Sequence, residues 1–84
     1  MHWLRSWESF VRIVETGSMA AAARRLDCTR AQISKQVADL EREFGVRLFE
    51  RHGRGMVATE IGREILDHAG RIMAEMEAIR VAAA

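Results

Sequence analysis

The sequence has no proline, a single cysteine and no long apolar run among its 84 residues. The one cysteine, Cys28, excludes an internal disulfide and a cysteine-based zinc site, and its isolation is typical of a reducing compartment. No stretch approaches the length that crosses a membrane, and the N-terminus "MHWLRSWESF" lacks the basic region and apolar run of a signal peptide. We therefore expect one small, ordered, helix-rich domain in the cytoplasm.

Patterns that carry catalysis or bind metals are also lacking. There is no nucleophile beside a plausible base and no phosphate-binding glycine loop on a strand, and the three histidines lack the spacing of metal ligands. The sequence therefore predicts no enzyme activity, no metal and no cofactor. The glutamates on expected helices are interpreted as solvated charges: Glu41, Glu43, Glu60 and Glu64.

The net charge of +1 indicates no particular partner, but the charge is unevenly distributed. Residues 1–59 carry ten Arg and Lys against seven Asp and Glu, whereas residues 60–84 carry three against five. The basic residues gather in two clusters, each beside an expected turn. The first cluster is Arg24, Arg25, Arg30 and Lys35, and the second is Arg47, Arg51 and Arg54.

Apolar periodicity and capping residues predict four helices, over about 4–16, 19–26, 30–44 and from 60 almost to the C-terminus. Gly17 is placed to end the first helix, and Ser18 offers an N-cap for the second. Thr29 with Gln32 has the form of a capping box for the third, which Gly45 ends. Thr59 caps the last helix.

Between the third and fourth helices the pattern changes to short extended segments. "VRLFER" and "MVAT" are rich in branched or aromatic residues, and the glycine-punctuated "HGRG" between them indicates the turn of a small β-hairpin. A short helix, a tight turn and a longer capped helix form the helix-turn-helix pattern, and the hairpin adds a wing. The predicted fold is mainly α, a winged helix-turn-helix with a three-helix core, followed by a long C-terminal helix.

The third helix is predicted to bury one stripe and to present donors and acceptors on its other side. Ile33, Val37, Leu40 and Phe44 share a face at the period of a helix. In a helix-turn-helix the front of this helix enters the major groove of DNA. Arg30 or Lys35 could donate to guanine, Gln32 could pair with adenine, and Ser34 or Thr29 could reach a base or a phosphate. Ala31 and Ala38 would let the backbone approach closely, although a plain solvated face remains the alternative.

The last helix carries an apolar seam of nearly three heptads. A helix of about 25 residues is about 37 Å long and extends past a domain of this size. We therefore expect a second copy of the chain to cover the seam across a two-fold axis. The seam consists of Ile65, Ala69, Ile72, Met76 and Ile79, and Ala83 continues it.

Residues 10–62 resemble, nearly end to end, the N-terminal DNA-binding region of LysR-type transcriptional regulators. The shared marks are Phe10, Gly17-Ser18, the alanines 21–23, Leu26, Thr29, Ser34, Gln36, Leu40-Glu41, Gly45, Leu48-Phe49, Arg51, Thr59 and Gly62. The resemblance implies a DNA-binding domain over 1–59 and a linker helix over 60–84 through which two chains pair. A small-molecule effector is expected only where a further C-terminal domain exists.

The same resemblance assigns roles by position. Arg30, Ala31, Ser34 and Lys35 fall where the family contacts the major groove, and Arg54 falls at the wing tip that enters the minor groove. This chain departs from the family at four positions. The family often has Gln or Ser followed by Pro at positions 30 and 31, Thr at position 20 and Arg at position 35, where this chain has Arg30, Ala31, Ala20 and Lys35. The full DNA-binding set that we predict is Ser18, Arg24, Thr29, Arg30, Ala31, Gln32, Ser34, Lys35, Arg51 and Arg54.

The main hypothesis is therefore sequence-specific binding of an interrupted dyad in double-stranded DNA by a dimeric, nucleoid-associated bacterial regulator. The rival hypothesis is a helical protein-protein interaction or oligomerisation module whose long last helix is the functional part. Trp3 and Trp7 could stack on single-stranded nucleic acid, but they share a face with Phe10 and are assigned to the core. Cys28 is assigned a structural role rather than a redox role.

Overall fold

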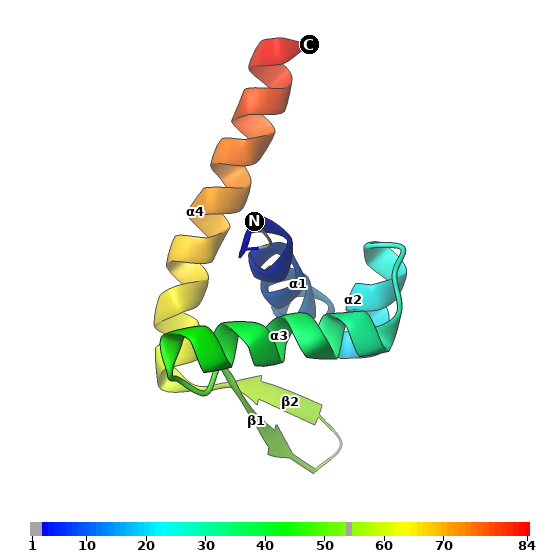
Figure 1. The fold of residues 1–84 in the computed structure, drawn as a ribbon, viewed down its shortest axis with the longest axis vertical. Coiled ribbons are helices and arrows are strands. Elements are labelled where there is room, and N and C mark those ends of the chain that lie inside the picture. Colours follow the sequence, from blue (N-terminus) through cyan, green and yellow to red (C-terminus); the bar gives the residue numbers. More distant parts are fainter. Residues whose placement is uncertain (1–2, 54) are drawn as a thin grey trace.

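The computed structural model describes residues 3–53 and 55–84, and it has the predicted order of elements (Figure 1). Helices α1 (Trp3–Thr16), α2 (Met19–Arg25) and α3 (Arg30–Phe44) precede strands β1 (Phe49–His52) and β2 (Gly55–Ala58). Helix α4 (Glu60–Ala83) ends the chain. The prediction of a winged helix-turn-helix with a long C-terminal helix is confirmed.

The helix ends lie where the capping residues predict them. Gly17 follows α1 at a φ of 89°, and the Ser18 hydroxyl accepts a hydrogen bond from the Ala21 amide at 3.0 Å to begin α2. Gly45, with a φ of 65°, closes α3 in the left-handed conformation that glycine adopts without strain. Because these caps involve groups only a few residues apart, local sequence was sufficient to predict them.

The turn between α2 and α3 has a backbone feature that the sequence did not reveal. Asp27 has a φ of 56°, a left-handed conformation that is uncommon outside glycine, asparagine and aspartate. The Cys28 amide then donates to the Ala23 carbonyl at 3.0 Å, which brings the chain back across the end of α2. This turn sets the angle between the two helices.

Helices α1, α2 and α3 supply most of the core, and α1 contacts each of the other three helices. Phe10 and Ile13 of α1 are buried with Ala22 of α2 and with Ile33 and Leu40 of α3. Burial of each large aliphatic or aromatic side chain stabilises the fold by about 1.5–3 kcal/mol. The predicted core placement of the two tryptophans is confirmed only in part, because both are half-buried at its edge beside Phe44.

The wing is shorter than the sequence predicted. Strands β1 and β2 pair antiparallel from Phe49 opposite Ala58 to His52 opposite Gly55, so the residues from 46 to 48 lie outside the sheet. The Leu48 amide donates instead to the Glu41 carboxylate at 2.7 Å, and the Leu48 carbonyl accepts from the Thr59 amide at 2.9 Å. The interpretation of Glu41 as a solvated charge is therefore wrong, because its carboxylate fastens the wing to α3.

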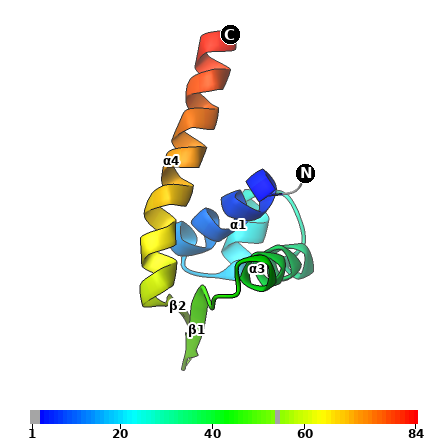
Figure 2. The ribbon, with the colours of Figure 1, turned by 60° about the vertical axis from the view of Figure 1, so that its left-hand side comes forward.

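Helix α4 begins against this same segment. The Thr59 hydroxyl donates to the Arg47 carbonyl at 2.6 Å and accepts from the Gly62 amide at 2.9 Å. Figure 2 shows α1 between the lower part of α4 and α3, while the upper part of α4 rises beyond the other elements. Within the described residues, no helix combines the length and the apolar character that crossing a membrane requires.

Part of the predicted apolar seam of α4 belongs to the core of its own domain. Ala69 is only 1% exposed, and Ile65 packs against the same core cluster. The assignment of Ala69 to a contact between two chains is therefore wrong, because its side chain is buried in the core of its own domain. Ile72 and Met76 are half-buried, and Ile79 is 67% exposed. The part of the seam that its own domain does not bury is the narrower stripe of Ile72, Met76 and Ile79.

The start of α4 provides a test of this packing. A methyl group at Gly62 would overlap the Leu48 carbonyl oxygen and lie 3.1 Å from the Thr59 hydroxyl, so Gly62→Ala should lower the free energy of unfolding by about 1–3 kcal/mol. Gly70 lies on the same helix with nothing within 4 Å of its added methyl group, so Gly70→Ala should raise that free energy by about 0.5–1 kcal/mol. Urea denaturation at one protein concentration measures both. Equal effects of the two changes would contradict the packing at Gly62.

Candidate nucleic-acid interface

The outward face of α3 is set by the burial of its inward face. Ile33 and Leu40 are fully buried and Val37 nearly so, which confirms most of the predicted stripe. Phe44 is the exception: it is 52% exposed, because it lies at the end of the helix beside the two tryptophans. The opposite side presents exposed residues that include two alanines: Ala31, Ser34, Lys35, Ala38 and Arg42. This face could therefore approach a flat or grooved surface closely.

The capping box at the front of α3 is confirmed, and it occupies groups that the sequence assigned to base reading. The Thr29 hydroxyl accepts from the Gln32 amide at 3.1 Å, and the Gln32 side-chain oxygen accepts from the Thr29 amide at 2.9 Å. The same oxygen also accepts from the Thr29 hydroxyl at 3.2 Å. A bidentate pair with adenine needs that oxygen as its acceptor, so the side-chain NH₂ of Gln32 is the group that remains available.

The structure brings Ser18, Arg30 and Arg51 together around one hollow of about 120 Å³. Ser18 comes from the start of α2, Arg30 from the start of α3 and Arg51 from strand β1. A neighbouring hollow of about 150 Å³ lies between α3 and the wing and is lined by Ser34, Arg47 and Arg51 among others. Three distant segments of the sequence thus converge on one surface beside the outward face of α3.

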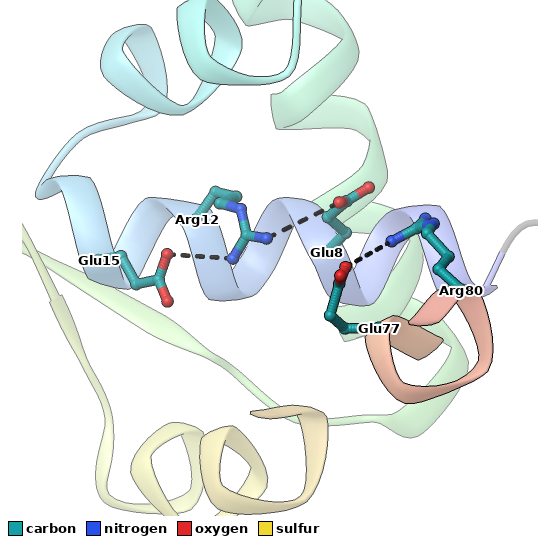
Figure 3. Close-up of polar contacts among 5 residues, drawn as sticks. All are labelled: Glu8, Arg12, Glu15, Glu77 and Arg80. Atoms are coloured by element: carbon teal, nitrogen blue, oxygen red, sulfur yellow. Dashed lines mark hydrogen bonds and ion pairs between the residues drawn. The ribbon is translucent and has the colours of Figure 1, made fainter. Parts of the chain in front are cut away.

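The basic residues differ in whether an ion pair holds their side chains. On α1, the Arg12 guanidinium lies 3.0 Å from Glu15 and 3.9 Å from Glu8, and on α4 the Arg80 guanidinium lies 3.4 Å from Glu77 (Figure 3). Arg30 and Arg51 are exposed and make no ion pair with any other residue that the structure describes. Their charges are therefore available to an anionic partner.

The remaining predicted residues are less closely grouped. Arg24 is exposed in the last turn of α2, at the opposite end of that helix from Ser18. Arg54 lies outside the described residues. Cys28 is half-buried and packs against the core cluster, as its structural assignment requires. No group of three metal-ligating side chains gathers within residues 3–53 and 55–84.

Two polar contacts on α3 were missed from the sequence. The Ser9 hydroxyl, fully buried on α1, donates to the side-chain oxygen of Gln36 across the packed helices. Asp39 pairs with both Lys35 and Arg42, one turn away on either side. The first contact joins residues 27 positions apart and left no local signal, whereas the spacing of the second could have revealed it.

Comparison with known proteins places this surface in context. Residues 4–63 match the model of a family described as bacterial regulatory helix-turn-helix proteins of the lysR family. The chain is also 43% identical over 77 residues to an uncharacterized HTH-type transcriptional regulator from the ibpB-leuC intergenic region of Azotobacter vinelandii. That match covers 92% of this chain and 54% of the relative, so the chain spans about half the length of that protein.

Solved structures of similar shape include two DNA complexes. A complex of the BenM DNA-binding domain with the benA site 1 DNA aligns with a TM-score of 0.87 at 29% identity, covering 95% of this chain and 90% of that one. A complex of the CbnR DNA-binding domain with DNA aligns with a TM-score of 0.80 at 36% identity, covering 96% and 98%. Both similarities extend over nearly the whole chain, including α4.

The buried contact between Ser9 and Gln36 yields a stability prediction. Ser9→Ala removes the donor from the Gln36 side-chain oxygen inside the packed interface of α1 and α3, and it should lower the free energy of unfolding by about 1 kcal/mol. Ser34→Ala, at an exposed position of α3, is the control, because both changes gain the same helix propensity. Urea denaturation compares them. A loss in the control as large as that in Ser9→Ala would rule out a role for the buried hydrogen bond.

Proposed function

The chain belongs to the LysR family of bacterial regulatory helix-turn-helix proteins, and from this membership we propose that it binds double-stranded DNA in a sequence-specific manner to regulate transcription. One observation carries the proposal. The outward face of α3, where two alanines keep the side chains short, lies beside Arg30 and Arg51, which make no ion pair among the described residues. Residues 1–59 form the DNA-binding unit, and residues 60–84 connect two copies.

Phosphate contacts position the domain on the duplex. Arg30 and Arg51 converge from α3 and from the wing, where they can hold one stretch of sugar-phosphate backbone beside the major groove. The free amides at the start of α3 add a favourable partial charge for a phosphate. Such contacts do not depend on the base sequence, and they supply most of the salt-dependent affinity.

Base contacts come from the middle of the outward face. Lys35 can reach guanine O6 and N7, and Ser34 can donate to or accept from a base edge. Gln32 contributes one hydrogen bond through its side-chain NH₂ while its oxygen keeps the cap of α3. Ala31 and Ala38 leave the backbone close to the groove floor. Arg54 lies between Gly53 and Gly55 in the sequence, and we propose on the sequence alone that its side chain enters the minor groove.

Two copies of the chain pair through the narrower stripe of α4. Ile72, Met76 and Ile79 form an apolar stripe that the domain's own core covers only in part, and a two-fold axis would cover the rest with the same stripe of a second copy. The two recognition helices would then address two half-sites of an interrupted dyad. We expect this assembly in the cytoplasm, bound to the chromosome.

Two substitutions separate base reading from phosphate binding. Lys35→Ala should weaken binding to the preferred site by about 1–3 kcal/mol and relax discrimination at one or two base pairs. Arg51→Ala should weaken binding to all duplexes and flatten the plot of log affinity against log salt by about 0.9 for each phosphate that the side chain no longer neutralises. Fluorescence anisotropy on duplexes selected from a random pool measures both. A wild-type affinity that does not change with salt would contradict DNA binding and favour a protein-protein module.

The role of the narrower stripe in pairing can be tested with a substitution in it and a matched control on the same helix. Ile79 and Val81 are both 67% exposed, but two residues apart on a helix they point about 200° apart. Ile79→Glu should make the protein monomeric and reduce dyad binding to weak half-site binding, because burying an unpaired carboxylate is costly. Val81→Glu should leave both unchanged. Sedimentation measures the assembly; dimers that tolerate Ile79→Glu, or a monomeric wild type, would rule out this interface.

A further inference from the structure

Asp39 lies at the edge of the outward face of α3, half-buried beside the exposed Lys35 and Arg42, and a carboxylate is unexpected next to a surface that approaches phosphates. It follows Lys35 by one turn and precedes Arg42 by three residues. The side chains of Lys35 and Arg42 are 76% and 73% exposed, while that of Asp39 is 27% exposed. The carboxylate is therefore less exposed to solvent than the two longer cationic side chains that contact it.

Each oxygen of the carboxylate holds one cation. The Lys35 ammonium lies 2.9 Å from Oδ2, and the Arg42 guanidinium pairs with Oδ1. The hydrogen bond from Lys35, together with the positive charges of Lys35 and Arg42, holds the pKa of Asp39 below its usual value. The group is therefore a carboxylate at neutral pH, and the three side chains together contribute one positive charge instead of two.

This arrangement contrasts with the phosphate-binding side of the surface. Arg30 and Arg51 have no ion pair among the described residues, whereas Lys35 and Arg42 are both held by Asp39. A bare lysine and arginine on the groove face would bind the phosphates of any sequence, because that attraction ignores the bases. A carboxylate between them offsets this attraction and repels phosphates itself.

Resting on the proposed function, we propose that Asp39 is a specificity-determining residue that selects against non-specific DNA by holding Lys35 and Arg42 and repelling the backbone. At a preferred site Lys35 exchanges the carboxylate for guanine acceptors, so its ion pair is replaced by base contacts. On other sequences Lys35 can contact only phosphates, and exchanging its ion pair with Asp39 for a phosphate contact adds little affinity. Asp39 thereby widens the difference between the two affinities, which is how specificity is defined.

Asp39→Asn tests this inference, because it keeps the size of the side chain and removes its charge. Asp67→Asn is the matched control: it removes the same charge from an exposed position on α4. Affinities are measured over a range of salt for two duplexes, one selected from a random pool by the wild type and one scrambled with the same composition. Circular dichroism checks that both variants keep their helix content.

We expect Asp39→Asn to raise affinity for the scrambled duplex by about three- to tenfold, as for one unit charge near phosphates at a solvent-exposed surface. Its salt dependence on that duplex should steepen by about 0.9 for each phosphate that a released cation binds. Affinity for the selected duplex should change less, so the ratio of the two affinities should fall. Asp67→Asn should leave that ratio at its wild-type value.

Equal behaviour of the two variants would overturn the inference. So would a loss of affinity for the selected duplex with none gained on the scrambled one, since Asp39 would then read a base, as a carboxylate can at the amino group of cytosine. A wild type without salt-dependent binding would overturn the proposed function, and the inference with it. A wild type that binds normally, with no effect of Asp39→Asn, would overturn the inference alone.

Discussion

Burial of one stripe of α3 against α1 is the constraint on which the rest of the structure depends. Ile33 and Leu40 are fully buried against a core that contains Phe10, so α3 cannot turn about its axis without exposing them to water. At about 1.5–3 kcal/mol for each such side chain, that rotation would cost a large part of a small domain's stability. The outward direction of Lys35 and Arg42 is therefore a consequence of apolar packing.

The electrostatics of the outward surface follow from placement rather than from the number of charges. The chain has a net charge of only +1, and several basic residues are paired within their own helices. Exposed ion pairs contribute little to stability, typically less than about 1 kcal/mol, but they decide which cations remain free for a partner. Arg30 and Arg51 are two of the cations that have no ion pair with any residue that the structure describes.

The joint between the wing and α4 connects the two regions that DNA binding and dimerisation would use. The Thr59 hydroxyl caps α4 and also donates to the Arg47 carbonyl, while the lack of a side chain at Gly62 lets the Leu48 carbonyl lie against the helix. Because one residue serves both elements, the direction of α4 is coupled to the root of the hairpin. Pairing two α4 helices would therefore also orient two wings.

Sequence alone determined the features that depend on neighbours within a few residues. The capping box of Thr29 and the left-handed Gly45 were predictable because their hydrogen bonds and backbone angles are local. Tertiary structure decided which partners the side chains on those helices contact. Glu41 fastens the wing, Ala69 joins the core instead of a seam, and Asp39 takes both cations of its face. Periodicity shows which residues share a face of a helix, but only packing decides what that face meets.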